Sequence, residues 1–156
     1  MTSLSGIMKP HDRIRAARDR LGLSMNDVAV KAGVGVPGYR DVEFYEDEAF
    51  SVVPLGDLRS ICCILELDLF AMFEVADLVD GSNRLGGDLV HLRRNELIQR
   101  RRTELGLTRE QLGDLIGFET ITVEQMEQES DFLEQWPLEL IETLAVELSL
   151  PLRTLI

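Results

Sequence analysis

Apolar residues recur every three to four positions along most of the chain, and this spacing predicts amphipathic helices. The clearest example lies between residues 107 and 127, where we expect two short helices. Thr108 is a suitable N-cap with Gln111 three residues later, and Gly117 ends the first helix. The residues expected to face inward are Leu112, Leu115 and Ile116 in the first helix, and Ile121, Val123 and Met126 in the second.

The same pattern occurs a second time, 84 residues earlier in the chain. The matching pairs are Leu21/Leu105, Ser24/Thr108, Val28/Leu112, Gly33/Gly117, Val42/Met126 and Glu43/Glu127. After a one-residue deletion the agreement continues, from Pro54 and Pro137 to Leu69 and Leu152. Self-similarity of this kind indicates two copies of one structural unit. We therefore expect an all-α fold of two tandem five-helix units, at about residues 11–73 and 95–156.

The expected domain boundaries follow from this repeat and from a glycine-rich stretch between the copies. The first unit takes residues 1–80 with a loose arm at 1–10, residues 81–87 form a linker, and the second unit takes residues 88–156. Further helices are expected at 11–21, 36–43, 55–66, 68–79 and 88–104, and acidic loops at 43–48 and 127–135. The apolar end of the chain is expected to dock in the core, with a homodimer contact as the alternative.

Two short helices joined by a tight turn that contains glycine are typical of a helix-turn-helix. Residues 107–127 resemble the Cro/repressor-type (xenobiotic response element) helix-turn-helix family, which reads Leu, Thr or Ser, three variable residues, Leu, four variable residues, Gly, and later Ile and Glu. The resemblance implies that the third helix of each copy enters the major groove of DNA. It also implies an ion pair between helix 1 and the end of helix 3, namely Arg18–Glu43 and Arg102–Glu127.

The charge of the chain disagrees with a DNA-binding function. The chain has 16 basic and 28 acidic residues, for a net charge of −12, and residues 1–80 and 81–156 each hold 8 basic and 14 acidic side chains. Between residues 107 and 147, Arg109 is the only basic residue against eleven acidic ones. Affinity for DNA comes largely from cationic side chains that displace counterions, so this copy lacks a suitable surface. A carboxylate-rich surface instead complements a basic protein and speeds encounter with it.

Two functions are therefore weighed, and the first is favoured. In the first, the chain is a non-enzymatic regulator that binds a basic protein, as an inhibitor, antitoxin, immunity-type protein or adaptor. The candidate contacts for this function are Glu46, Asp47, Glu48, Glu119, Glu124, Glu129 and Asp131. In the second, it is a DNA-binding transcriptional regulator of the xenobiotic response element family. The candidate contacts for that function are Arg13, Arg15, Arg40, Thr120, Thr122 and Gln125.

The arginines of the first helix of each copy have two possible roles. They could hold phosphate, or they could face the acidic helix 3 and loop of the other copy or of another subunit. The second possibility is slightly favoured, because helix 1 does not usually enter the groove.

Other classes of function find little support in the residues. His11 and His91 have no metal-ligand spacing from other histidines or cysteines, and no phosphate-binding glycine loop is present. We therefore expect no enzyme, no metal and no cofactor. No apolar run approaches about 18 residues, so we expect no membrane span. The adjacent Cys62 and Cys63 are expected to be small core residues of a cytoplasmic protein.

Overall fold

The computed structural model describes residues 8–75 and 92–156, and every regular element within them is a helix. The all-α fold is the one that the hydrophobic pattern predicts. The chain divides into two compact units, residues 1–74 and 75–156, and each is described by itself. The expected linker at residues 81–87 and the expected arm up to residue 7 lie outside the described residues.

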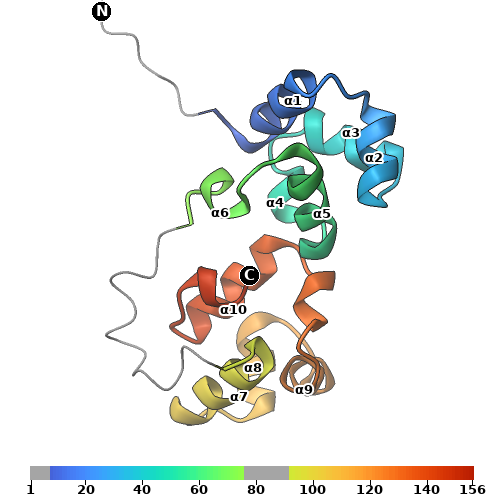
Figure 1. Ribbon diagram of the computed structural model, residues 1–156. Helices are drawn as coiled ribbons and strands as arrows, with labels where there is room; N and C mark the ends of the chain where they lie inside the picture. The colour runs from blue at the N-terminus through green and yellow to red at the C-terminus, as the bar shows by residue number, and fades with distance from the viewer. Residues whose placement is uncertain (1–7, 76–91) are drawn as a thin grey trace, which may run out of the picture. The chain divides into compact units, whose positions relative to one another are not determined.

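Residues 8–74 of the first unit form six helices, which are labelled in Figure 1. They are α1 (Pro10–Arg20), α2 (Met25–Ala32), α3 (Val36–Phe44), α4 (Glu48–Ser51), α5 (Leu55–Leu65) and α6 (Leu69–Met72). Helix α2 packs on α3 and α5, and α1 packs on the same two helices from another side. Ile14, Val28 and Leu58 are completely buried where these helices meet. Burial of apolar side chains of this size is the main favourable contribution to folding of such a unit.

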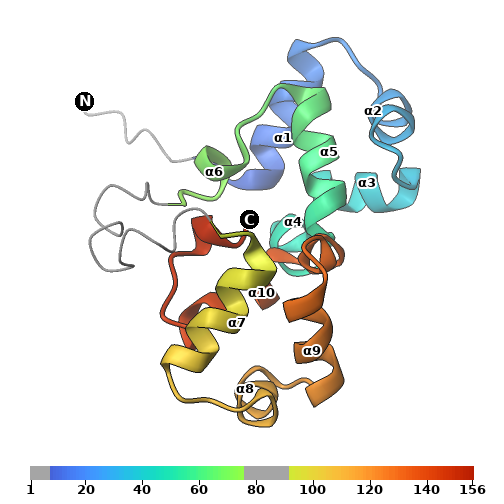
Figure 2. The same ribbon diagram turned by 60° about the horizontal axis from the view of Figure 1, so that its bottom comes forward.

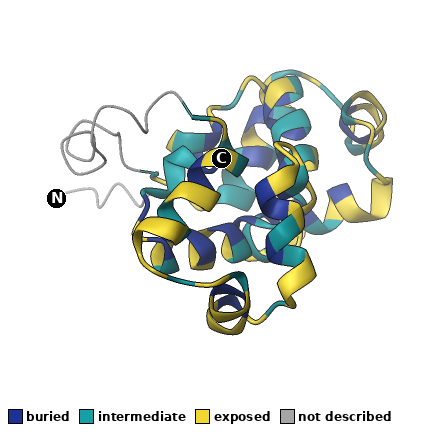
Figure 3. Cartoon of the chain, turned by 90° about the horizontal axis from the view of Figure 1, so that it is seen from below, coloured by how far each residue is buried: buried dark blue, intermediate teal, exposed yellow. Residues whose placement is uncertain are grey.

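In the part of the second unit that the structure describes, residues 92–156, there are four α-helices and two short 3-10 helices; Figure 2 labels the α-helices. They are α7 (Arg94–Glu104), α8 (Arg109–Ile116), α9 (Thr120–Gln128), η2 (Phe132–Gln135), α10 (Leu138–Glu147) and η3 (Leu152–Thr154). Helix α9 packs on α7 and α8, and α10 packs on α8 and η3. Leu155 near the carboxyl end is completely buried, so the end of the chain docks in the core. The helices present one buried and one exposed side, as Figure 3 shows.

The starts and ends of the short helices follow the sequence signals. Ser24 Oγ accepts a hydrogen bond from Asp27 N, and Thr108 Oγ1 accepts one from Gln111 N, both at 3.1 Å. The side chain of each third residue accepts from the backbone N–H of its cap, which completes two capping boxes. Gly33 and Gly117 then end α2 and α8 with φ of 72° and 77°, a conformation that favours glycine.

Several expected boundaries are wrong. The helix expected at 68–79 is limited in the described residues to α6, because Asp68 caps its start and Glu74 has a left-handed φ of 55° after its end. The helix expected at 88–104 begins only at Arg94, because Arg93 is an extended N-cap residue whose N–H donates to Glu96 at 3.0 Å. The remaining residues of both expected helices lie outside the described ranges. The acidic loop expected at 127–135 contains the short helix η2, and the one expected at 43–48 ends at the first residue of the short helix α4.

Candidate protein-interaction surface

A shallow hollow lies at the turn between α8 and α9. Its lining residues are Glu110, Gly113, Asp114, Gly117, Phe118, Glu119 and Thr120. Three of them, Glu110, Asp114 and Glu119, are carboxylates that are exposed to solvent, and none is basic. We call these three residues the acidic face.

The hollow depends on a close approach between α8 and the turn that follows it. A Cβ atom on Gly113 would lie 2.5 Å from the backbone oxygen of Phe118. Phe118 N also donates to Gly113 O at 2.9 Å. Because no side chain separates them, the turn lies directly against α8, and Glu119 is held beside the same hollow as Asp114.

Two exposed apolar side chains follow residues of the hollow, and the prediction that they face inward is wrong. Leu115 comes after Asp114 and is 49% exposed, while Ile121 comes after Thr120 and is 55% exposed. The inward positions of the two helices are filled by Leu112, Gly113, Ile116, Val123 and Met126.

Arg109 is the single basic residue of α8 and α9, and it is bound within the unit. Its Nε donates to Glu127 Oε2 at 2.7 Å, and its Nη1 lies 3.6 Å from Glu124 Oε1. The hydrogen bond to Glu127 raises the pKa of Arg109. Two glutamates therefore balance this positive charge, and it does not offset the acidic face.

The arginines of α1 bind backbone oxygens of the first unit. Arg13 donates to Met8 O and Ala71 O, each at 2.8 Å. Arg15 donates to Glu43 O, and Arg20 donates to Leu65 O at 3.3 Å. These carbonyls include those at the ends of α3 and α5, where helices lack internal donors. The first-helix arginines thus complete the fold of their own unit.

The arginines of α7 have the same role in the second unit. Arg101 Nε donates to Leu148 O at 2.9 Å, and Arg94 Nη1 donates to Leu155 O at 3.2 Å. Arg94 also pairs with Glu134 at 2.8 Å. The partners of these arginines are groups of their own unit, whereas the favoured possibility named the acidic helix 3 and loop of the other copy or of another subunit.

Both structural ion pairs expected from the sequence are present. Arg18 Nε lies 2.6 Å from Glu43 Oε1, and Arg102 Nε lies 2.5 Å from Glu127 Oε1. In each pair Nη2 donates to the second carboxylate oxygen, at 3.0 Å and 3.2 Å, and the glutamates are buried. The hydrogen bond to Glu43 raises the pKa of Arg18. These four residues hold α1 to α3 and α7 to α9.

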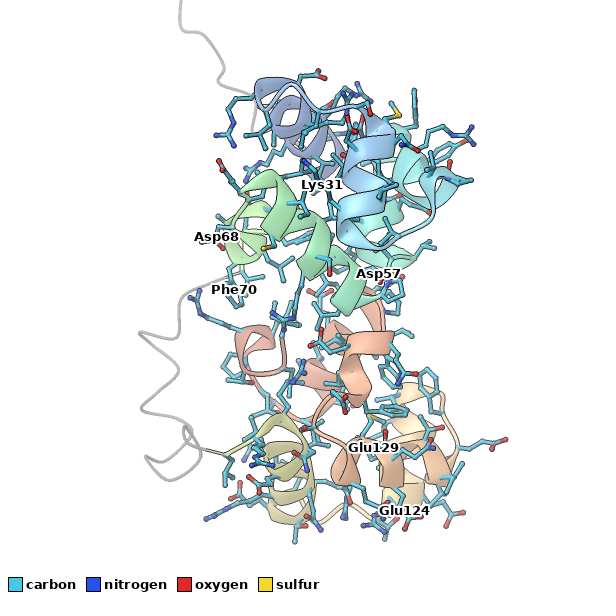
Figure 4. All side chains as sticks on the ribbon, turned by 45° about the vertical axis from the view of Figure 1, so that its right-hand side comes forward. Lys31, Asp57, Asp68, Phe70, Glu124 and Glu129 are labelled. Carbon is cyan, nitrogen blue, oxygen red and sulfur yellow. The ribbon has the colours of Figure 1, made fainter. Side chains whose placement is uncertain are left out.

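The seven residues expected to contact a protein differ in their exposure and in whether they are already paired within their unit. Glu46 pairs with Lys9 at 2.6 Å, and Glu124 pairs with Arg109 and accepts from Gln128 at 3.1 Å. The others are Asp47, Glu119, Glu129 and Asp131, which are exposed, and Glu48, which is half-buried at the start of α4. Figure 4 marks Glu124 on α9 and Glu129 at its carboxyl end. Of the seven, Glu119 is the one that belongs to the acidic face.

The expected DNA contacts do not form a basic surface within either unit. Arg13 and Arg15 are bound as described above. The side chain of Arg40 is 60% exposed, but Asp41 lies 3.5 Å from it. Thr120 lines the hollow beside the carboxylates, Gln125 is exposed and Thr122 is half-buried.

The roles of three residues in this site were not identified from the sequence. Glu110 and Asp114 were counted only as part of the negative charge, and the helical spacing that puts them one turn apart on α8 could have grouped them. The role of Arg109 as second partner of Glu127 depends on a contact between α8 and α9 that no local pattern predicts.

In comparisons with known proteins, no family model, no curated protein and no solved structure matches this chain. Within residues 8–75 and 92–156, no group of three or more His, Cys, Asp and Glu side chains is placed to hold a metal ion. None of the helices in this described part has the length and apolar character that crossing a membrane needs.

Proposed function

We propose that this chain is a non-enzymatic regulator of tandem helix-turn-helix architecture that binds a basic partner protein through its acidic surfaces. The observation that carries the proposal is the acidic face: three exposed carboxylates line the hollow at the turn between α8 and α9, and the two arginines of the adjoining hollow, Arg102 and Arg109, are paired with Glu124 and Glu127. A regulator of this kind would act as an inhibitor, antitoxin, immunity-type protein or adaptor.

Support for a repeated unit comes from positions that share an environment. The pairs that are buried in both units include Ile14/Ile98, Val28/Leu112, Tyr39/Val123, Val42/Met126, Glu43/Glu127, Leu55/Leu138, Leu58/Ile141, Ile61/Leu144, Cys62/Ala145 and Leu65/Leu148. Left-handed backbone also recurs in pairs, with φ of 64° and 70° at Gly22 and Gly106, and of 56° and 50° at Glu66 and Ser149. A shared core and shared turns are what a duplicated unit would retain.

Electrostatics supports a protein partner over DNA for the second unit. Each carboxylate that faces a phosphate removes an attraction and adds a repulsion, and the acidic face would place three of them there. A basic protein surface would meet the same carboxylates favourably, and the exposed Leu115 and Ile121 would be covered on binding.

One observation favours the alternative, a DNA-binding transcriptional regulator of the xenobiotic response element family. In the first unit the residues that correspond to the acidic face are Asn26, Val30 and Gly35, which carry no charge, and α2 and α3 expose Lys31 and Arg40. Gly38 leaves open space beside α3. Arginine is the usual side chain for reading guanine. These two helices nevertheless offer only two cations, and Asp41 balances one of them.

A selection from displayed peptides tests the proposal. The wild-type chain and the variant Glu110→Gln/Asp114→Asn/Glu119→Gln would be used as baits under equal conditions, after circular dichroism has shown equal helicity. We expect wild-type binders to be enriched in Lys and Arg and to bind the variant at least ~10-fold more weakly. Binders without a basic bias, or with equal affinity for the variant, would reject the proposal.

A further inference from the structure

Three large apolar side chains are exposed at the carboxyl ends of α3 and α4 in the first unit. Phe44 ends α3, Tyr45 is its C-cap residue, and Val52 is the C-cap residue of α4. Their exposed fractions are 58%, 62% and 58%. We call these three residues the aromatic corner. Exposed groups of large apolar residues commonly mark interaction sites.

The second unit indicates that folding does not require these side chains. At the repeat positions that correspond to the aromatic corner it has Gln128, Glu129 and Gln135. The backbone is nearly the same, since Tyr45 has φ −111° and ψ 128° and Glu129 has φ −110° and ψ 119°. A polar residue is therefore compatible with this local structure. Phe44 contacts Arg15, but the corresponding residues of the second unit, Gln128 and Gln99, are both glutamines, so such a unit folds without this contact.

The surroundings of the corner indicate the charge of its partner. Asp47 is exposed and makes no cap hydrogen bond to α4, and Glu48 follows it. The Arg15 guanidinium lies 5.7 Å from the Phe44 ring centre, which shows that this ring accepts a cation on its face. A second copy of the chain would bring like carboxylates together across a two-fold axis, which opposes a homodimer here.

We infer that the aromatic corner, together with Asp47 and Glu48, binds a basic segment of a partner protein that also carries an apolar side chain. The inference rests on the proposed function and adds a second docking surface to it, on the first unit. Carboxylates attract the Lys or Arg residues of the segment, and Phe44 and Tyr45 take its apolar and guanidinium groups on their faces.

Titration of the full chain with two short peptides of equal charge tests the inference. The first peptide alternates arginine and leucine, and the second replaces every leucine by serine. The matched variant is Phe44→Gln/Tyr45→Gln/Val52→Gln, which follows the polar character of the second unit without changing the charge. We expect the variant to keep its melting midpoint and to bind the arginine–leucine peptide at least ~10-fold more weakly. Backbone amide resonances of residues 44, 45 and 52 should shift when this peptide is added to the wild type.

The following results would contradict the inference or limit it. Equal binding of the arginine–leucine peptide by wild type and variant, or no binding by the wild type, would overturn the inference. So would protection of these three residues from a soluble paramagnetic agent in the free monomer, or self-association that the variant abolishes. If Glu110→Gln/Asp114→Asn/Glu119→Gln weakens binding and the corner variant does not, the proposed function stands without this second surface. If neither variant changes binding, both proposals fail.

Discussion

The two buried ion pairs should differ in how much stability each arginine contributes. Glu43 and Glu127 are both buried, and each receives two hydrogen bonds from its arginine. In the second unit, however, Arg109 Nε also donates to Glu127 at 2.7 Å. The residue at the corresponding position of the first unit is Met25, so Glu43 lacks this second cation.

The magnitude follows from the charge that each substitution strands. Arg18→Ala leaves a buried carboxylate without its cation and should cost ~3–5 kcal/mol. Arg102→Ala leaves Glu127 with Arg109 and should cost only ~1–3 kcal/mol. Arg109→Met, which copies Met25, removes a partly exposed partner and should cost less than Arg102→Ala. The double variant Arg102→Ala/Arg109→Met should lose more than the sum of its single variants, because only then is Glu127 fully stranded.

The aromatic residues allow each unit to be followed separately in urea. Trp136 is the only tryptophan, and it is buried in the second unit against Phe118 with ring centres 4.5 Å apart. Both tyrosines, Tyr39 and Tyr45, lie in the first unit. Tryptophan emission therefore reports unfolding of the second unit, and tyrosine emission in a Trp136→Phe background reports the first. An Arg102→Ala cost equal to that of Arg18→Ala, or strict additivity in the double variant, would refute the reasoning.

Three further substitutions test local features of the two units. Gly113→Ala should destabilise the second unit by ~1–3 kcal/mol in the Trp136 assay, because its Cβ would lie 2.5 Å from Phe118 O; an unchanged midpoint would contradict the close approach. Glu66→Gly should stabilise the first unit by up to ~1 kcal/mol, because φ there is 56°, and a loss of stability in the tyrosine assay would be the opposite result. Hydrogen bonds from Ser24 lower the pKa of Asp27, so its contribution is present above its unfolded-state pKa and is lost as the pH falls through the folded one. Asp27→Asn should therefore flatten the acid limb of first-unit stability, and an unaltered limb would count against this capping box.

Local structural features, which depend on residues only a few positions apart, were predicted well from the sequence. The capping boxes at Ser24 and Thr108 and the glycine stops at Gly33 and Gly117 depend on groups only a few residues apart. The buried ion pairs span 25 residues, and they became predictable because the same spacing occurs twice. The resemblance to a helix-turn-helix family was read from these same residues, and it stays a prediction.

Features that depend on distant packing were not predictable in this way. Helical spacing suggested that Leu115 and Ile121 face inward, but a helix of eight or nine residues has too few turns to fix the direction of each side chain. The repeat argued against an inward direction for Leu115, since the corresponding residue of the first copy is the charged Lys31. The carbonyl partners of the first-helix arginines lie up to 61 residues away, so no local pattern identifies them.

The salt dependence of duplex DNA binding tests the central claim most directly. Fluorescence anisotropy of a labelled random-sequence duplex would be measured with the full chain over a series of salt concentrations. The account predicts weak binding that does not saturate, with no steep slope of log K against log salt, because most of the arginines are bound within their own units and the acidic face repels phosphate. Saturable binding whose slope is about −4 or steeper, and which Arg40→Ala abolishes, would contradict it and support the DNA-binding alternative.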